Sequence, residues 1–155
     1  MLSHGSDGMK QASEDAVLNA NYIKARLSDL MSPAFPDGPC MHEALFDDEW
    51  LKGTDITTLD FAKAMIDEGF HPMTMYFPLV VHGAMLIEPT ETEPKREIDR
   101  FCDAVLALAR AAKTGDVGRF KGAPFHAPMR RLDETQAARK PRLRWTPPAE
   151  QMAAE

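Results

Sequence analysis

A helical stripe between Pro94 and Ala112 constrains the fold more than any other feature of this sequence. Its apolar side chains recur at spacings of three and four residues: Ile98, Phe101, Val105, Leu108 and Ala112. Side chains at this spacing share one face of an α-helix, which must then be buried against another element. Thr90 and Glu93 are spaced as a capping box. This predicts a helix start beside them, with Pro94 in the first turn.

Two further segments carry a helical pattern. Residues 6–30 place Ala20, Ile23 and Leu27 on one stripe, and Ser6 and Asp7 suit the N-cap. Asn19 and Asn21 are poor helix formers in mid-helix. Either they face solvent or bond locally, or one of them faces a subunit interface.

The other helical segment is 59–68. Thr57 or Thr58 suits its N-cap, and Gly69 suits the position after its C-cap. A weaker short helix is predicted at 133–139.

The remaining pattern predicts short strands and loops. Residues 41–46 and 84–87 indicate strands, while 73–81 contains Pro78 and forms either an edge strand or extended chain. The Pro-rich segment 32–40 must be a loop. The order of elements predicts an α+β fold (an α/β sandwich), with helices on a small, mainly antiparallel sheet.

The expected domain organisation has three parts. A long linking helix occupies 1–31, a small α/β domain occupies 40–146, and a flexible tail occupies 147–155. The domain includes a basic arm, 119–146.

Composition excludes several classes of protein. The longest apolar stretch, 76–87, is interrupted by Pro78, His82 and Gly83, so we expect no membrane span. The N-terminus lacks a basic region followed by an apolar one, so we expect no secretory signal and a cytoplasmic location. In that compartment the two cysteines, Cys40 and Cys102, are expected to be free thiols.

The charge is unevenly distributed along the chain. Residues 1–118 contain 20 acidic and 10 basic side chains, whereas 119–144 contain 8 basic and 2 acidic ones. Prolines interrupt the basic segment and few aromatic residues accompany it, so we expect no nucleic-acid binding. An arm that lies on the acidic body, or that faces an anionic ligand or partner, fits the same pattern.

Catalytic and metal motifs are sparse. No two histidines or cysteines have metal-ligand spacing, so no metal site is predicted, and His42 and His71 are more simply explained by backbone partners. There is also no phosphate loop and no nucleophile elbow.

Two polar segments remain as candidate sites. In 87–93, Glu88 follows a buried strand, where we expect it to meet an arginine or backbone donors, while Thr90 and Glu91 suit a helix start. Arg130 and Arg131 are adjacent in an irregular segment. They either bind an anion or form surface salt bridges.

Seven blocks, in order, carry a family resemblance. They are VLNANY (17–22), MHE (41–43), LDFAK (59–63), GFHP (69–72), YFPL (76–79), EPTETE (88–93) and RRLDE (130–134). Over residues 5–146 the chain resembles the C-terminal region of subunit 2 of glycine dehydrogenase (decarboxylating), the P-protein of the glycine cleavage system.

The resemblance implies a fold-type I pyridoxal-phosphate enzyme in which a small C-terminal domain closes over the cofactor-bearing domain. The family decarboxylates glycine and passes the aminomethyl group to the lipoyl arm of the H-protein. We expect one group of residues to face the cofactor cleft or a subunit interface: His71, Glu88, Thr90, Glu91, Arg130 and Arg131.

The sequence departs from the family at one decisive point. The family's cofactor lysine follows a histidine, and this chain contains no His-Lys pair. The chain alone is therefore expected to be inactive and to bind no pyridoxal phosphate covalently. Its expected partner is a cofactor-domain polypeptide or subunit 1, with the H-protein as an indirect one. The alternatives are a non-catalytic binding or regulatory module, and a remnant with an exposed apolar face.

Overall fold

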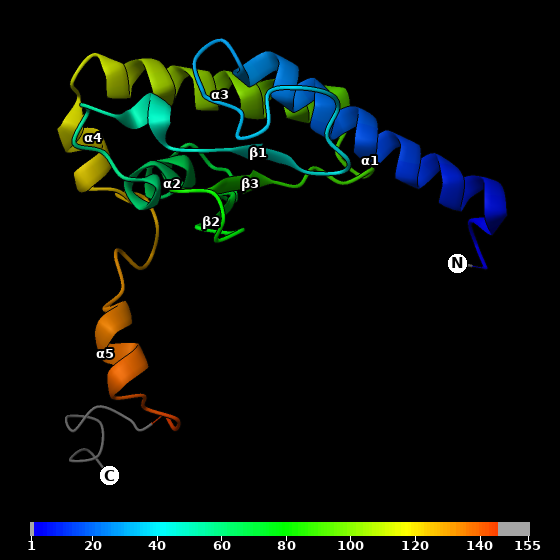
Figure 1. The fold of residues 1–155 in the computed structure, drawn as a ribbon. Helices are drawn as coiled ribbons and strands as arrows, with labels where there is room; N and C mark the ends of the chain where they lie inside the picture. The colour runs from blue at the N-terminus through cyan, green and yellow to red at the C-terminus, as the bar shows by residue number, and fades with distance from the viewer. Residues whose placement is uncertain (1, 146–155) are drawn as a thin grey trace.

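The computed structural model describes residues 2–145, so the predicted tail 147–155 lies outside the described residues. The elements follow one another in the order drawn in Figure 1: α1 (Gly5–Leu27), β1 (Ala44–Phe46), η1 (Glu49–Leu51), α2 (Thr58–Asp67), β2 (Thr74–Met75), β3 (Met85–Ile87), α3 (Lys95–Lys113), α4 (Val117–Lys121) and α5 (Glu134–Arg139).

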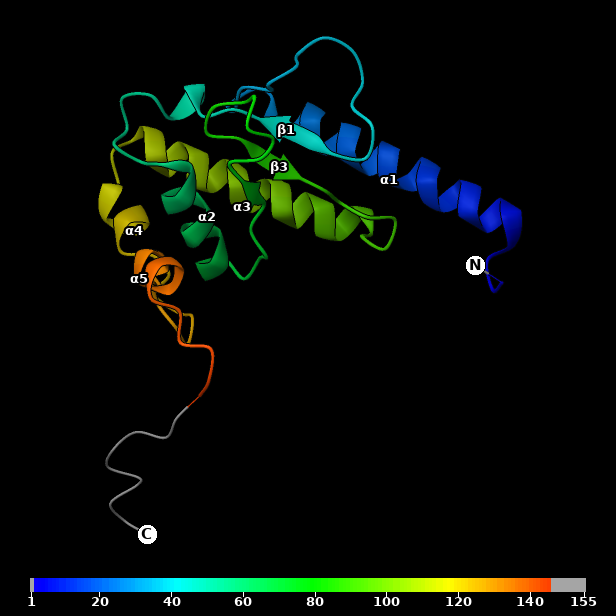
Figure 2. The same ribbon diagram turned by 60° about the horizontal axis from the view of Figure 1, so that its bottom comes forward.

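The three strands form one antiparallel sheet in the order β1-β3-β2. Ala44 pairs with Ile87 and Phe46 with Met85, and these four side chains are buried. Leu45 and Leu86 pair on the opposite face and stay partly exposed. The helices pack on the sheet, with α1 and α3 side by side (Figures 1 and 2). The predicted α+β class is confirmed.

Aromatic rings join α2 to its neighbours in the core. Phe61 meets Trp50 edge-on at 5.0 Å between ring centroids and stacks on Phe120 of α4 at 6.1 Å. Phe61 and Phe120 are fully buried. Burial of each such side chain contributes about 1.5–3 kcal/mol. The core therefore fixes α4, and with it the start of the basic arm.

A polar network joins α1 to α3. Asp99 accepts hydrogen bonds from Tyr22 Oη at 2.5 Å, Arg26 at 2.8 Å and Lys95 at 2.7 Å. Lys95, followed by Tyr22, lowers the pKa of Asp99. Arg26 also reaches Asp103 at 2.7 Å. Hydrogen bonds of this kind between partly exposed groups fix the relative setting of two helices more than they stabilise the fold.

The predicted helix starts were wrong at two places. Helix α1 begins at Gly5 behind His4, before the predicted caps Ser6 and Asp7. Helix α3 begins at Lys95, and no capping box forms at Thr90. Residues 90–93 close a separate turn instead, in which the Glu93 amide donates to the Thr90 carbonyl.

A capping box is present at α2, where Thr57 is the N-cap. The Asp60 amide donates to the Thr57 side chain, and the Thr57 amide donates to the Asp60 carboxylate. Gly69 has a φ of +84°, as expected for the residue that ends this helix.

The predicted strand at 73–81 is an edge strand over only two residues, Thr74 and Met75. Tyr76 then takes a φ of +59°, which turns the chain out of the sheet. Its hydroxyl accepts a hydrogen bond from the Leu59 amide at 3.2 Å, which fixes this turn against the start of α2. Residues 76–82 consequently form a protruding loop.

The basic arm lies on the body at its start and projects at its end. Arg119 pairs with Glu68, and Lys121 and Arg131 pair with Asp60. The described residues from Met129 onward are exposed, and α5 buries no side chain. Figures 1 and 2 show α5 well away from the sheet.

Both cysteines are free thiols, as predicted, and Cys102 lies in the core. Burial raises the pKa of the Cys102 thiol to about 11. None of the helices in the described residues combines the length and the apolar character needed to cross a lipid bilayer.

Candidate functional site

Three of the predicted site residues meet in one groove. His71, Glu88 and Thr90 line a groove of about 540 Å³ between α3 and the end of β3. Apolar side chains make up much of its lining: Ile23, Phe70, Met73, Ile98 and Phe101. Glu91 is exposed and lies outside the groove lining. The groove is thus a depression whose lining combines apolar side chains with several polar ones.

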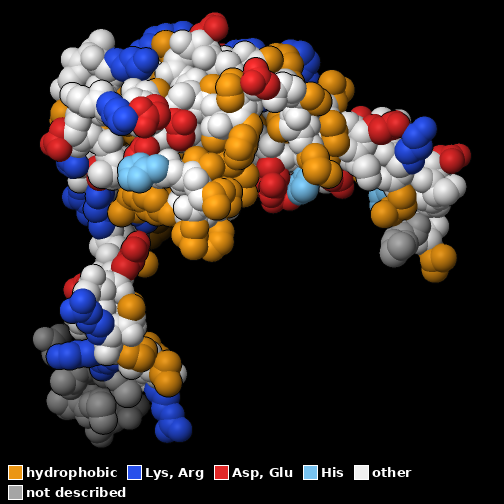
Figure 3. Space-filling view, in the orientation of Figure 1, with side chains coloured by type: hydrophobic (Ala, Val, Ile, Leu, Met, Phe, Trp, Pro, Cys, Tyr) orange, Lys and Arg blue, Asp and Glu red, His pale blue; other side chains and the backbone are white. Residues whose placement is uncertain are grey.

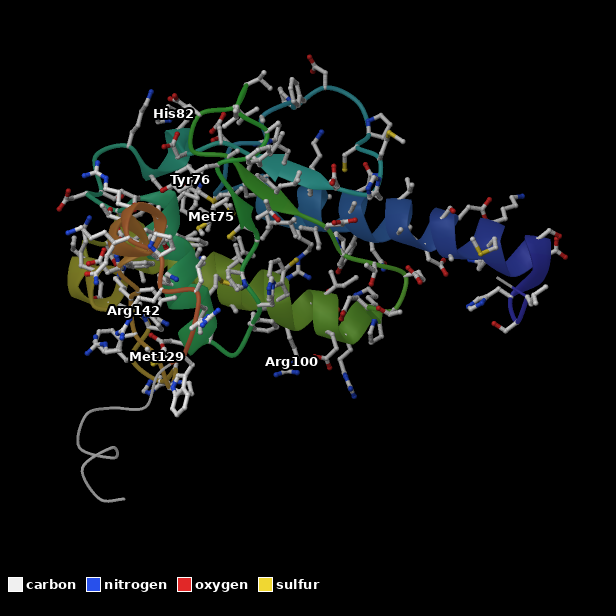
Figure 4. All side chains as sticks on the ribbon, turned by 90° about the horizontal axis from the view of Figure 1, so that it is seen from below. Met75, Tyr76, His82, Arg100, Met129 and Arg142 are labelled. Carbon is white, nitrogen blue, oxygen red and sulfur yellow. The ribbon has the colours of Figure 1, made fainter. Side chains whose placement is uncertain are left out.

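Arg100 is a groove residue that the sequence analysis did not identify. It lies on α3 and lines the groove, with its guanidinium 5.9 Å from the centroid of the Phe70 ring. Figure 4 shows Arg100 on the side of the molecule seen from below. Its guanidinium also donates to Glu97, another residue of the groove lining, at 2.6 Å, so this cation is already paired with a carboxylate.

Among residues 2–145, neither an arginine nor a backbone donor binds Glu88, so the expectation of one or the other was wrong. Its side chain is 57% exposed, and its carboxylate lies 3.7 Å from Nε2 of His42. The physical reason is that β3 ends at Ile87, so Glu88 is the first residue outside the buried strand. Solvent and His42 therefore take the role expected of buried donors.

His42, Glu43 and Glu88 form a group that we call the strand-end cluster. Nε2 of His42 lies 3.8 Å from a Glu43 oxygen and 3.7 Å from a Glu88 oxygen. The register of β1 and β3 explains this, since one step beyond the Ala44–Ile87 pair brings Glu43 opposite Glu88. The backbone partner expected for His42 is not present among the described residues.

Two asparagines of α1 fasten the segments on both sides of the strand-end cluster. Asn21 exchanges two hydrogen bonds with the backbone of Cys40, at 2.7 and 2.9 Å. Asn19 donates to the carbonyl of Thr90 at 3.0 Å and to that of Glu93 at 3.3 Å. Asn21 also bonds locally, to the Val17 carbonyl. The mid-helix asparagines thus hold the ends of two strands.

Arg130 and Arg131 do not reach this groove. Arg131 pairs with Asp60 at 2.8 Å and donates to the Phe120 and Ala123 carbonyls. Arg130 donates to the Gly122 carbonyl and stacks over Phe125. Both arginines fasten the arm near the ends of α2 and α4, and their expected place at a cleft or subunit interface stays a prediction.

Asp60 is the buried group that receives these cations. Its side chain is 4% exposed and binds Lys121 at 2.9 Å as well as Arg131. Burial alone would raise the pKa of Asp60, but hydrogen bonds from Thr57, Lys121 and Arg131 outweigh burial and lower the pKa to about 2. Asp60 is therefore a fully ionised anchor for the arm.

The groove does not fit a covalently held pyridoxal phosphate. Such a cofactor needs a lysine amine within the site. Among the described residues that line the groove, none is a lysine, and Arg100 is the cation present. Lys95 and Lys121 are engaged with Asp99 and Asp60.

A comparison with protein families gives a match over most of the chain. The model described as "Glycine dehydrogenase, C-terminal domain" matches residues 12–128.

Individual relatives agree with the family match. A probable glycine dehydrogenase (decarboxylating) subunit 2 of Caulobacter vibrioides is 82% identical over 149 residues, which are 96% of this chain and 28% of that protein. The corresponding protein of Kosmotoga olearia is 51% identical, over 95% of this chain and 30% of that protein. That of Caldanaerobacter subterraneus is 49% identical, over 94% and 30%. The chain thus spans less than a third of the length of these relatives. With this family match and this level of identity, the chain belongs to the glycine dehydrogenase (decarboxylating) subunit 2 family, of which it represents the C-terminal domain.

Proposed function

We propose that this chain is the C-terminal part of a cytoplasmic glycine decarboxylase and forms part of its cleft and subunit interface. In this proposal helix 1–31 leads into the small domain 40–146, which closes on a cofactor-bearing polypeptide. That polypeptide, together with subunit 1, supplies pyridoxal phosphate and its lysine, and the aminomethyl group passes to the lipoyl H-protein. The chain alone is inactive.

The observation that supports this proposal is an uncovered apolar surface. Phe35, Met41, Leu45, Phe77, Pro78 and Leu86 line a second groove of about 500 Å³, which we call the outer groove. Leu79 and Val80 follow Pro78 on the protruding loop and are 81% and 86% exposed. Figure 3 shows apolar side chains gathered on the underside of the body.

The surroundings of the outer groove suit a large partner. In the view from below, Met75 and Tyr76 share this side of the molecule with His82, and with Met129 and Arg142 of the arm (Figure 4). Contiguous apolar surface of this kind on a small domain marks an interaction site. The relatives contain more than twice as much additional chain as this domain, which is enough to cover it.

The test is complementation in an exchange assay. The chain is mixed with a polypeptide comprising the remaining part of the Caulobacter vibrioides relative, together with its subunit 1, and glycine–bicarbonate exchange is measured. We expect exchange well above that of either part alone. No gain on mixing would contradict the proposal.

A pair of matched variants locates the docking surface. Leu79→Asp combined with Val80→Asp places charge on the protruding loop, and we expect a reduction of exchange by about tenfold or more, equivalent to about 1.4 kcal/mol of docking free energy. The control is Leu2→Asp, which also replaces an exposed apolar side chain by a charged one, but near the N-terminus and far in sequence from the loop. It should leave the exchange rate unchanged. Equal effects of both changes would contradict docking at the outer groove.

A separate measurement tests the cofactor part of the proposal. Borohydride reduction of the chain with added pyridoxal phosphate, followed by mass measurement, should leave no stoichiometric adduct on a single lysine. One such adduct would show that the chain holds the cofactor covalently.

The projecting arm favours one alternative function, a non-catalytic binding or regulatory module. The described residues 129–145 are exposed and contain six basic side chains. A partner captured by the chain, and lost when Arg139, Lys140 and Arg144 are changed to Gln without loss of exchange activity, would favour this alternative.

A further inference from the structure

The strand-end cluster has the composition of a metal site. It joins one imidazole nitrogen to two carboxylates, and these three ligand atoms lie within 4.8 Å of one another. No two of its residues have the sequence spacing of a known metal motif, so only the strand register brings them together.

Two neighbouring carboxylates make the strand-end cluster favourable for a cation. Glu43 and Glu88 stand opposite each other one step beyond the last paired residues of β1 and β3. Like charges at directly opposite positions destabilise a strand pair. Within the described part of the chain, His42 is the basic group that contacts both carboxylates. A bound cation would relieve the repulsion between the two carboxylates.

The distances are close to those of a coordinated ion. Zinc binds histidine nitrogen and carboxylate oxygen at about 2.1 Å, which places neighbouring ligand atoms about 3.4 Å apart in a tetrahedral site. The separations from Nε2 of His42 are 3.7 and 3.8 Å, and the two carboxylate oxygens lie within 4.8 Å of each other. Movements of a few tenths of an ångström would close the first two differences, and the half-exposed carboxylates have room to close the third.

The backbone around the cluster is fixed before any ion binds. Asn21 holds the backbone of Cys40, two residues before His42, and Asn19 holds that of Thr90, two residues after Glu88. Both asparagines are half-buried and lie in the central part of α1. A site built on such supported elements loses little entropy when it binds its ion.

We propose that His42, Glu43 and Glu88 bind a divalent cation of the zinc class. One nitrogen and two oxygens favour zinc or cobalt over magnesium and calcium, which prefer all-oxygen sites. Glu88 also lines the larger groove and Glu43 lines the outer groove. The bound cation therefore stands between the two depressions, with its remaining coordination positions open to solvent or to a ligand carboxylate. This proposal does not depend on the activity of the family.

The experiment is a titration of the full chain with Zn²⁺ in a calorimeter, and with Co²⁺ followed by visible absorption. We expect one Zn²⁺ per chain, and a Co²⁺ spectrum that Zn²⁺ abolishes. His42→Ala and Glu88→Gln should each weaken binding by at least about tenfold, since even changes outside the ligand shell do so at metal sites. Asn21→Ala, which keeps all three ligands, should weaken binding less than either.

Matched controls make the result decisive. His126→Ala and Glu49→Gln remove an exposed histidine and an exposed glutamate outside the cluster, and should leave affinity unchanged. Circular dichroism of each variant checks that it is folded. Absence of stoichiometric binding to the unaltered chain would overturn the proposal. The proposal would also be overturned if His42→Ala bound Zn²⁺ as tightly as the unaltered chain. The same holds if His42→Ala and His126→Ala lost Zn²⁺ affinity to the same extent.

Discussion

At the scale of single residues, a few buried or opposed charges explain most of the specific geometry. Asp60 is ionised in the interior because three donors compensate for its burial. Glu88, by contrast, escapes burial because its strand ends one residue earlier. The sequence alone could not show that the Asp60 carboxylate is buried and the Glu88 carboxylate exposed. Asp60 lies within an apolar helix pattern and Glu88 follows an apolar strand. The cationic partners of Asp60 and the histidine beside Glu88 are all more than forty residues away.

The depressed pKa of Asp60 predicts an acid-sensitive contribution to stability. The pKa is about 2 in the folded chain, below the ordinary value of 3.8. The contribution is therefore fully present above pH 4 and is lost as the pH falls through about 2. Asp60→Asn should remove about 2 kcal/mol of unfolding free energy at neutral pH and flatten the dependence between pH 4 and 2.

Urea unfolding at a series of pH values measures this effect. Asp29→Asn changes an exposed aspartate on the same body and serves as the control. A variant at position 60 that keeps the acid-dependent loss of the unaltered chain would contradict the assignment.

At the scale of elements, amphipathic helices were predictable and the strand ends were not. The stripe of α3 and the end of α2 at Gly69 follow from local spacing. The capping box formed at Thr57 rather than Thr90 because residues 90–93 close their own turn before Pro94. The edge strand stopped at Met75 because Tyr76 takes a left-handed backbone conformation and bonds to the start of α2.

The candidate site was predictable only in part, for the same reason. The six candidate residues were expected to face a cofactor cleft or a subunit interface, and the structure brings three of them, His71, Glu88 and Thr90, into one groove. Arg131 lies outside that groove, because Asp60 and backbone carbonyls hold it. Convergence of His42 with Glu88 depends on strand register, which residue spacing does not reveal.

The protruding loop depends on a glycine at its base. Gly83 has a φ of +57°, and a Cβ there would lie 2.1 Å from Cγ of Asp48. Asp48 in turn binds His82 at 2.8 Å and raises its pKa. Gly83→Ala therefore combines backbone strain with a collision, and should disturb the whole segment 76–83.

Thermal unfolding of two alanine variants separates these effects. Gly38 also has a positive φ, of +76°, but has open space where a Cβ would be. Gly38→Ala should cost about 1 kcal/mol for its backbone conformation alone. Gly83→Ala should cost at least 1 kcal/mol more, on the order of a typical overpacking penalty. If both variants lost the same unfolding free energy, Asp48 would have moved away from the added Cβ at no cost.

At the scale of the whole molecule, the body and the arm contribute unequally to stability. The core joins α1, the sheet, α2, α3 and α4, whereas α5 buries nothing. Arg131 joins the arm to the body by pairing with the buried carboxylate of Asp60. Stability should therefore depend on the chain up to Arg131 and little on the described residues after it.

Two shortened chains test this division. A chain ending at Leu132 keeps Arg131 and should unfold within a few degrees of the full chain. A chain ending at Pro128 lacks Arg131 and so leaves Asp60 with one cation fewer. Its free energy of unfolding should be about 1–3 kcal/mol lower. Circular dichroism during heating measures both. A large loss in the longer of the two would mean that the arm stabilises the body beyond Arg131.

The two free thiols lie in opposite environments, and this makes them natural reporters. Cys40 lines the outer groove, while Cys102 is fully buried with a pKa of about 11. An alkylating reagent should modify Cys40 in seconds to minutes and Cys102 only when the core opens. If the outer groove is the docking surface, adding the cofactor-bearing polypeptide should shield Cys40 first. In the unaltered protein, the alkylation rate of Cys40 therefore reports whether the outer groove is covered, and that of Cys102 reports whether the core is unfolded.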